Sequence, residues 1–388
     1  MTRADRWLLP DGIDEVLPPQ ARQIEVLRRH LLDLLDHWGY DFVIPPALEY
    51  LDSLLTGTGK DLDLRTFKVT DQLSGRMMGL SADTTPQVAR IDAHSLAPEG
   101  VSRLSYCRTV FHAKAPSLLA NRTPTQIGAE LYGEAGVAAD VEIISLMVAM
   151  IDKAGIKDIH LDLGHVGVFR ALADKAGISA EQQNELFDLL KLKCASDLDA
   201  WADREIKDAK LCEAFKLLTR LQGDRKLLDE SIARLAELVP ETSAELQHIQ
   251  KVTDQLAMRF PNTPFYFDLT ELRGYDYHTG LVFAAYVPGY GDAVAQGGRY
   301  DETGAVFGRA RPATGFSADL KVLARFGTQP VARKQTVVAP GSDDPLLWEK
   351  IQQLREQGVR VLVQLNAEAI PADQTLQFQA GQWQLVDA

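Results

Sequence analysis

The chain has 388 residues, of which 46% are hydrophobic and 24% charged, and this ordinary globular composition excludes a disordered, fibrous or membrane protein. Its length exceeds a single ordinary core and predicts about two or three domains. With 41 Lys and Arg against 54 Asp and Glu, the net charge of −13 opposes non-specific binding to a nucleic-acid backbone.

The first part of the chain alternates helices and strands. Between residues 24 and 38 apolar side chains recur at three- and four-residue steps, and this spacing predicts an amphipathic helix. Strands are predicted at 40–44, 65–69, 76–80 and 159–163, and a second long helix at 140–153.

The texture changes twice in the remainder. Residues 171–260 are rich in Leu, Ala, Glu and Lys and predict an inserted helical unit. Strands at 265–272 and 280–287 then indicate a central hairpin. From residue 335 a strand at 336–339, a helix at 344–357, a strand at 359–365 and a hairpin near Ala380-Gly381 predict a small α/β unit. Residues 336–388 carry three basic and seven acidic side chains, so this unit would repel RNA.

These patterns predict four segments. They are a core at 1–170, a helical insertion at 171–260, a second part of the core at 261–328, and a C-terminal α/β domain at 329–388.

The three cysteines are far apart and lack C-x-x-C spacing, which argues against a disulfide framework or a zinc site. No H-x-x-x-H, phosphate-loop or G-x-S-x-G motif is present, so we expect no metal or other cofactor. The N-terminus has no signal-peptide core, and the best apolar run, at 143–151, covers half a membrane span. These features together favour a cytoplasmic protein.

The most informative segment lies between the two predicted hairpin strands. It combines Arg273, Tyr275, Tyr277 and His278 within a few residues. An arginine fork suits a carboxylate, and Tyr and His hydrogen-bond small polar ligands. A polar turn without a ligand fits this segment equally well.

Three other segments are candidates for ligand contact. At 297–300, two glycines beside Arg299 and Tyr300 would let the backbone approach a ligand. Gln126 and Glu130 alternate on a predicted strand, with Gly128 leaving room between them, although a solvated strand face is the alternative. Residues 83–86 are typical of a helix start.

In chain order these segments resemble the catalytic domain of histidyl-tRNA synthetases over residues 8–325. Residues 273–277 resemble the family's R-G-L-D-Y-Y signature, 297–301 its G-G-R-Y-D signature, and 39–49 its first motif. The resemblance implies an α+β fold of the class II aminoacyl-tRNA synthetase type. Such a fold has a mostly antiparallel sheet flanked by helices, a helical insertion, and dimerisation through the first-motif helix.

Two departures from that family bear on activity. Its F-R-x-E arginine, which contacts the ATP α-phosphate and the substrate carboxylate, is replaced by His112, and the glutamate by Lys114. Its third-motif arginine is replaced by Val322. Such charged groups stabilise phosphate-displacing transition states, so the resemblance implies that ATP activation is lost.

The amino-acid side of the pocket is retained and resembles the regulatory subunits of ATP phosphoribosyltransferase. These share Y-H-T-G at 277–280 and A-D-x-T-P-Q-V-A-R-I-D at 82–92, although Ser81 stands where that family has arginine. The histidine-binding residues implied by the resemblance are Asp83, Thr85, Gln126, Glu130, Arg273, Tyr277 and His278. Tyr275, Thr279 and Gly280, beside them, are possible relays.

The resemblance implies a non-catalytic subunit that binds no cofactor or tRNA. It would dimerise within a hetero-octamer, activate a short catalytic subunit that condenses ATP with phosphoribosyl pyrophosphate, and mediate feedback inhibition by histidine. In this assignment Asp83 faces the ammonium of histidine and Arg273 with Gln126 its carboxylate. Glu130, with Tyr277 or His278, faces the imidazole.

Three alternatives remain open. An active synthetase and a free-standing adenylating enzyme are disfavoured by the residues at 112, 114 and 322. An RNA-binding translation regulator would need a basic face, which the net charge of −13 argues against.

Overall fold

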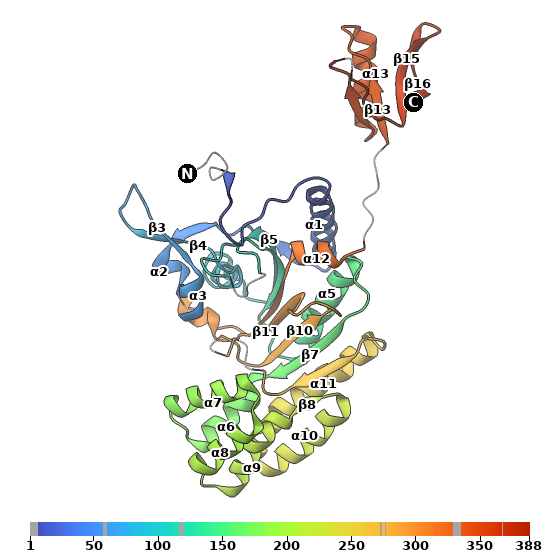
Figure 1. The fold of residues 1–388 in the computed structure, drawn as a ribbon. Helices are drawn as coiled ribbons and strands as arrows, with labels where there is room; N and C mark the ends of the chain where they lie inside the picture. Colours follow the sequence, from blue (N-terminus) through green and yellow to red (C-terminus); the bar gives the residue numbers. More distant parts are fainter. Residues whose placement is uncertain are drawn as a thin grey trace. The chain divides into compact units, whose positions relative to one another are not determined.

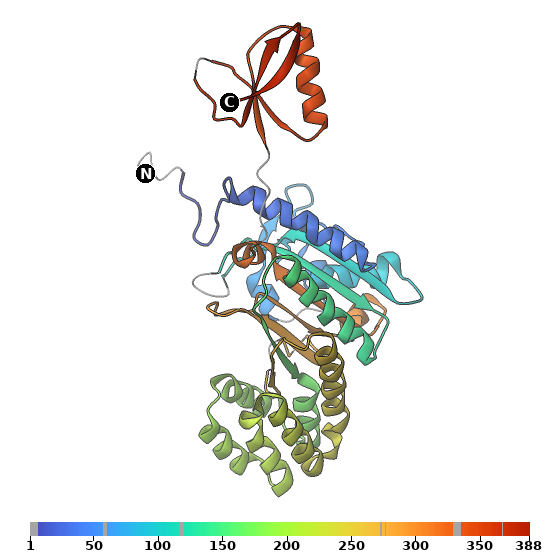
Figure 2. The ribbon, with the colours of Figure 1, turned by 90° about the vertical axis from the view of Figure 1, so that its right-hand side faces the viewer.

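The computed structural model describes residues 7–56, 60–115, 120–271, 274–275, 277–328, 335–366 and 368–388. It divides into two compact units, Met1–Gln329 and Pro330–Ala388, which we describe separately. Figures 1 and 2 show the elements of both units.

A nine-stranded sheet forms the centre of the larger unit (Figure 1). Its strands, in spatial order, are β1 (Asp41–Phe42), β5 (Ser102–Thr109), β6 (Thr125–Tyr132), β12 (Ala313–Asp319), β11 (Ala295–Arg299), β10 (Leu281–Tyr286), β7 (His160–His165), β9 (Phe265–Asp268) and β8 (Gln222–Gly223). Neighbours are antiparallel except β1 with β5 and β7 with β9. This mostly antiparallel sheet, flanked by helices, confirms the predicted α+β class.

Three helices pack against one face of the sheet: α1 (Gln20–His37), α5 (Val137–Lys153) and α12 (Leu320–Phe326). Figure 2 shows α1 and α5 side by side. They confirm the helices predicted at 24–38 and 140–153. The odd-numbered residues Ile127, Ala129 and Leu131 of β6 belong to the same apolar core as α5. Because side chains alternate along a strand, the even-numbered residues of β6 face the opposite side.

The opposite face carries shorter elements. They are α4 (Thr85–Arg90), a π-helical turn (Ile91–Leu96) and a 3₁₀ turn (Thr303–Phe307). A second apolar cluster lies here and includes Tyr106, Tyr132 and Tyr300. Buried tyrosine hydroxyls require hydrogen-bond partners, so this apolar cluster must contain polar acceptors.

A separate three-stranded antiparallel sheet precedes this region in the chain. It consists of β2 (Leu48–Tyr50), β4 (Met77–Leu80) and β3 (Phe67–Thr70), in that spatial order, with α2 (Leu51–Leu54) and α3 (Lys60–Arg65) beside it in sequence. The strands predicted near 65–69 and 76–80 are β3 and β4.

The helical insertion forms one layer of packed helices beneath the sheet in Figure 1. Its helices are α6 (Val166–Ala176), α7 (Ala180–Leu192), α8 (Ala195–Glu205), α9 (Ala209–Leu217), α10 (Arg225–Leu238) and α11 (Ser243–Arg259), with 3₁₀ turns at Leu218–Arg220 and Pro240–Thr242. Ser179 and Gln182 form a capping box that begins α7. The insertion also contributes β8, which sequence patterns missed because two residues are too short to show alternation.

The predicted hairpin of residues 265–272 and 280–287 is wrong. Both strands form, as β9 and β10, but β7 lies between them in the sheet. β9 runs parallel to β7, with the helical insertion as the crossover, and β10 runs antiparallel to it. A short connection between two strands favours a hairpin, but here β7 already occupies the space between them.

The smaller unit is an α/β structure with its own apolar core. It contains β13 (Thr336–Ala339), α13 (Pro345–Glu356), β14 (Arg360–Val363), β15 (Gln374–Gln379) and β16 (Gln382–Asp387), with sheet order β14-β13-β15-β16. Asp344 caps α13, which begins at Pro345. The predicted hairpin is confirmed, because β15 and β16 pair across Ala380 and Gly381, both with positive φ. Among the described helices, none is long and apolar enough to span a bilayer.

Candidate functional site

Glu130 is the centre of the polar cluster on the tyrosine-lined face. It lies on β6 opposite Gly315 of β12, and only 1% of the residue is exposed. A Cβ at Gly315 would stand 1.6 Å from Glu130 Oε2. Glycine at this position therefore provides the space that the carboxylate occupies.

Three hydroxyl groups donate to the Glu130 carboxylate. Thr85 Oγ1 lies 2.8 Å and Tyr106 OH 3.0 Å from Oε1, and Tyr300 OH donates to Oε2. Tyr300 OH also lies 3.3 Å from Tyr132 OH. The carboxylate therefore has donors from α4, β5 and the segment after β11, which places three chain segments around one charge.

Burial dominates the ionisation of Glu130. Desolvation raises the pKa of its carboxyl from the usual 4.5 to about 8, although the hydrogen bonds from Tyr300, Thr85 and Tyr106 oppose this shift. The nearby negative charge of Asp83 raises the pKa further. At neutral pH the unliganded site therefore favours a protonated carboxyl.

This shift predicts a pH-dependent stability. Between about pH 4.5 and pH 8 the folded state holds a proton on Glu130 that the unfolded chain has released. The free energy of unfolding should therefore fall as pH rises through this window, by up to about 1.4 kcal/mol per pH unit from this group. Urea unfolding of wild type and Glu130→Gln at several pH values checks this. A stability difference between the two that stays constant with pH would contradict it.

Asp83 and Gln126 form the other end of the cluster. Gln126 Nε2 donates to Asp83 Oδ1 at 2.9 Å, and Gln126 Oε1 accepts from the Thr84 amide at 3.0 Å. Ser81 is fully buried, and its hydroxyl donates to the Asp83 carbonyl at 3.0 Å and to Gln87 at 2.7 Å. Serine at 81 thus orders the backbone that carries Asp83. The predicted helix start is confirmed, since α4 begins at Thr85.

Tyr277 and His278 complete the described part of the cluster. The Tyr277 ring stacks on Tyr300 with centroids 4.9 Å apart, and burial and the Glu130 charge raise its pKa well above 10. His278 Nδ1 lies 3.3 Å from the Arg299 carbonyl, and burial lowers the pKa of His278 to about 4, so its ring is neutral at pH 7. Arg273, the seventh predicted residue, lies outside the described residues.

The six described members of the predicted set therefore share one face of the sheet. The Asp83 charge affects the pKa values of Glu130, Tyr277 and His278, which places it near all three. Sequence reasoning missed Tyr106 and Tyr132. Tyr106 lies directly opposite Gly128, where a Cβ would come within 2.6 Å of its hydroxyl. Gly128 therefore makes room for Tyr106, and its predicted role of leaving space for a ligand is not what its surroundings support.

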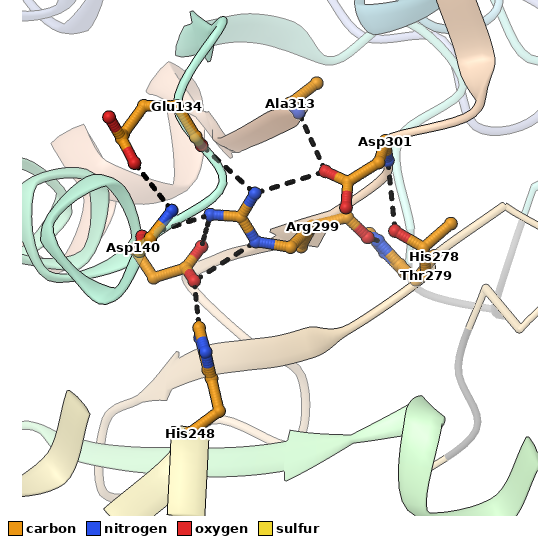
Figure 3. A network of polar contacts seen from close by, with 9 residues as sticks. Glu134, Asp140, His248, His278, Thr279, Arg299, Asp301 and Ala313 are labelled. Carbon is orange, nitrogen blue, oxygen red and sulfur yellow. Dashed lines mark hydrogen bonds and ion pairs between the residues drawn. The ribbon is translucent and has the colours of Figure 1, made fainter. Parts of the chain in front are cut away.

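The glycine-rich loop was also interpreted wrongly in part. Arg299 points away from Tyr300 and Glu130, and it is 5% exposed (Figure 3). Its guanidinium pairs with Asp140 of α5 at 3.0 Å and with Asp301 at 3.1 Å. Arg299 therefore braces the sheet against α5, because alternation on β11 sends it and Tyr300 to opposite faces.

The same network reaches the helical insertion. His248 of α11 lies 2.8 Å from Asp140 Oδ2, and the Glu134 carbonyl accepts from Arg299 at 3.2 Å (Figure 3). Gly298, beside Arg299, lies beneath the His278 ring, since a Cβ there would approach that ring to 2.8 Å. The two glycines of this loop thus serve packing within the chain.

The possible relays lie behind the cluster. Arg170 of α6 donates to the carbonyls of Tyr275 and His278 at 2.9 and 2.8 Å. The Tyr275 ring packs against Phe187 with centroids 4.5 Å apart. Thr279 Oγ1 accepts from the Asp301 amide at 3.0 Å, and a Cβ at Gly280 would meet Arg299 at 3.1 Å. These residues connect the back of the cluster to the helical insertion and β11.

The two altered motif positions lack fixed positive charge. His112 is 5% exposed, and burial together with the Arg65 charge lowers its pKa to about 4. Val322 of α12 packs against the main apolar core. Among the described residues, no cluster of His, Cys, Asp and Glu could hold a metal ion.

Comparisons with known proteins agree with this architecture. The histidyl-tRNA synthetase family model matches residues 12–323, and the model of the ATP phosphoribosyltransferase subunit HisZ C-terminal domain matches residues 334–386. The ATP phosphoribosyltransferase regulatory subunit of Azotobacter vinelandii is 51% identical, with 100% of this chain and 99% of that protein covered. The subunit of Chromohalobacter salexigens is also 51% identical, with 99% of each covered.

Solved structures show the same likeness. An ATP phosphoribosyltransferase regulatory subunit/histidyl-tRNA synthetase from Bacillus halodurans superposes with a TM-score of 0.82 at 26% identity, covering 96% of both chains. A histidyl-tRNA synthetase from Nostoc shares the fold, with a TM-score of 0.76 at 18% identity and 98% and 97% of the two chains covered. The chain therefore belongs to the family of ATP phosphoribosyltransferase regulatory subunits.

Proposed function

We propose that this chain activates a short-form ATP phosphoribosyltransferase catalytic subunit and makes it sensitive to feedback inhibition by histidine. The observation that carries the proposal is the buried cluster around Glu130 and Asp83, which offers a complement to each polar group of free histidine. Asp83 would accept from the ammonium, and Glu130 with Tyr277 or the free nitrogen of His278 would bind the imidazole. Gln126 and Arg273 are the sequence-based candidates for the carboxylate.

A non-catalytic role is supported by the residues where a synthetase of this fold contacts ATP. A neutral imidazole at His112 and an apolar side chain at Val322 offer no charge to a phosphate-displacing transition state. The chain would therefore keep amino-acid binding as a signal without using it for adenylate formation. Histidine would then act by binding two states of the assembly unequally.

Self-association within a hetero-octamer is part of the proposal. β1 pairs only with β5 and is an edge strand of the large sheet. Close to it in sequence, Phe42 is 46%, Ile44 80% and Leu48 41% exposed. Apolar side chains at a strand edge favour burial against a second copy of the chain.

The test is formation of phosphoribosyl-ATP by the short catalytic subunit of the same organism, with and without this chain, while histidine is titrated. We expect a higher rate with the chain present and a histidine inhibition that the catalytic subunit alone lacks. If the folded chain changes neither, the regulatory proposal fails. Histidine-dependent exchange of pyrophosphate with ATP would instead favour an active synthetase.

The relay part of the proposal predicts an effect of Arg170→Gln. Losing two charge-assisted hydrogen bonds to the carbonyls of Tyr275 and His278 should weaken histidine binding by about 1 to 3 kcal/mol. Calorimetric titration with histidine measures the change. Arg225→Gln is the matched control, because Arg225 lies in the same helical unit but pairs at its surface with Asp229 and Asp254. Equal affinities for the two variants would remove Arg170 from the relay.

A further inference from the structure

Arg65, the last residue of α3, holds a positive charge that no acidic group of the described chain balances. A bridge between Thr66 and His112 and a hydrogen bond from the Ala113 amide to the Arg65 carbonyl, at 2.8 Å, bring this residue beside the His112 segment. Its Nη2 lies 2.9 Å from His112 Nε2. Its Nε is buried without a hydrogen-bond partner, and no ion pair among the described residues includes it.

His112 does not satisfy this guanidinium. His112 Nε2 lies 2.9 Å from Arg65 Nη2 but also 3.0 Å from the Ala82 carbonyl oxygen. If the neutral ring carries its proton on Nε2, it can donate to Ala82 and offers Arg65 no lone pair. If the proton is on Nδ1, Nε2 can accept from Arg65, but the Ala82 oxygen loses its donor. One of the two contacts is therefore unsatisfied in either tautomer.

An anion bound to Arg65 would resolve this conflict. It would give the guanidinium an acceptor and allow His112 Nε2 to donate to Ala82. An arginine fork binds a carboxylate with two parallel hydrogen bonds, whereas a partly desolvated cation without an acceptor is costly. The arrangement is therefore suited to a small anionic group.

The anion site adjoins the acidic end of the pocket. Ala82 directly precedes Asp83, and the Asp83 charge reaches the His112 ring and affects its pKa. A cation and a carboxylate thus flank one neutral imidazole. Opposite charges at this spacing match the carboxylate and ammonium of a free α-amino acid.

We propose that Arg65 binds the carboxylate of free histidine while Asp83 faces its ammonium. The inference rests on the proposed function, because it takes histidine as the ligand of the Glu130 cluster. It adds a residue that no sequence signature indicated, and it assigns the site a requirement for the α-carboxylate. Histamine, which has the imidazole and the ammonium but no carboxylate, should therefore bind without help from Arg65.

The experiment compares histidine and histamine binding by calorimetry in the full-length wild type, Arg65→Gln and Arg65→Lys. We expect Arg65→Gln to weaken histidine binding by about tenfold to a hundredfold and to leave histamine binding within about twofold of wild type. Arg65→Lys, which keeps the charge without the fork, should fall between the two. Unchanged histamine binding also shows that the variant is folded.

Lys68→Gln is the matched control. It removes one positive charge three residues away, but Lys68 pairs with Asp63 at 2.7 Å and is 40% exposed, so both affinities should stay as in wild type. An equal loss of histidine and histamine binding in Arg65→Gln would indicate a packing role and overturn the inference. Unchanged histidine binding would do so as well.

Two further outcomes separate this inference from its neighbours. If inorganic phosphate binds wild type but not Arg65→Gln while histidine binding is unchanged, the anion is a phosphate and the carboxylate assignment is wrong. If wild type binds no histidine at all, the proposed function fails and this inference fails with it. Failure in Arg65→Gln alone leaves the proposed function intact.

Discussion

Replacing Arg299 by methionine is expected to lower the free energy of unfolding by about 3 to 5 kcal/mol, as for other broken buried ion pairs. The change leaves the fully buried Asp140 carboxylate with only His248 beside it. An uncompensated charge in a low-dielectric interior is costly, and here it would stand where β11, α5 and α11 meet. Urea unfolding at fixed pH measures the loss.

Two variants make this prediction specific. Arg299→Met combined with Asp140→Leu removes both charges, and it should recover much of the lost stability. Arg234→Met is the surface control, because Arg234 is 43% exposed and pairs with Glu237 at 2.8 Å, so it should cost less than about 1 kcal/mol. If Arg299→Met were no more destabilising than Arg234→Met, the network would have no structural role.

Gly315→Ala is expected to reduce histidine affinity by about a hundredfold, equivalent to about 3 kcal/mol. The added Cβ would stand 1.6 Å from Glu130 Oε2, and ladders to β6 and β11 hold the backbone on both sides. The carboxylate would have to leave its three hydroxyl donors, since overpacked cores relax by moving side chains. Calorimetric titration with histidine measures the effect.

The controls separate packing from binding. Gly291→Ala should leave affinity unchanged, because nothing lies within 4 Å of a Cβ at that turn. Adding Glu130→Ala to Gly315→Ala should relieve the overpacking and restore stability while histidine binding stays lost. Normal histidine affinity in Gly315→Ala would show that Glu130 is not a ligand of the effector.

Much of the fold could be predicted because the relevant information is local. Three- and four-residue spacing marks α1, and the composition of residues 171–260 marks the helical insertion. Periodicity follows directly from backbone geometry, which is the same whatever the element packs against. The motifs around residues 83, 130 and 277 likewise indicated one binding cluster, and the family assignment agrees with the resemblance they carried.

Which side chains meet was decided by the tertiary structure. β7 enters between β9 and β10, so two strands close in sequence do not pair. Arg299 faces α5 because β11 alternates, and its partner Asp140 lies 159 residues away. Arg65 reaches His112 across 47 residues. Spacing along the chain determines the face on which a residue lies, but its partners depend on which strand or helix occupies the neighbouring position, and that is a property of the whole packed sheet.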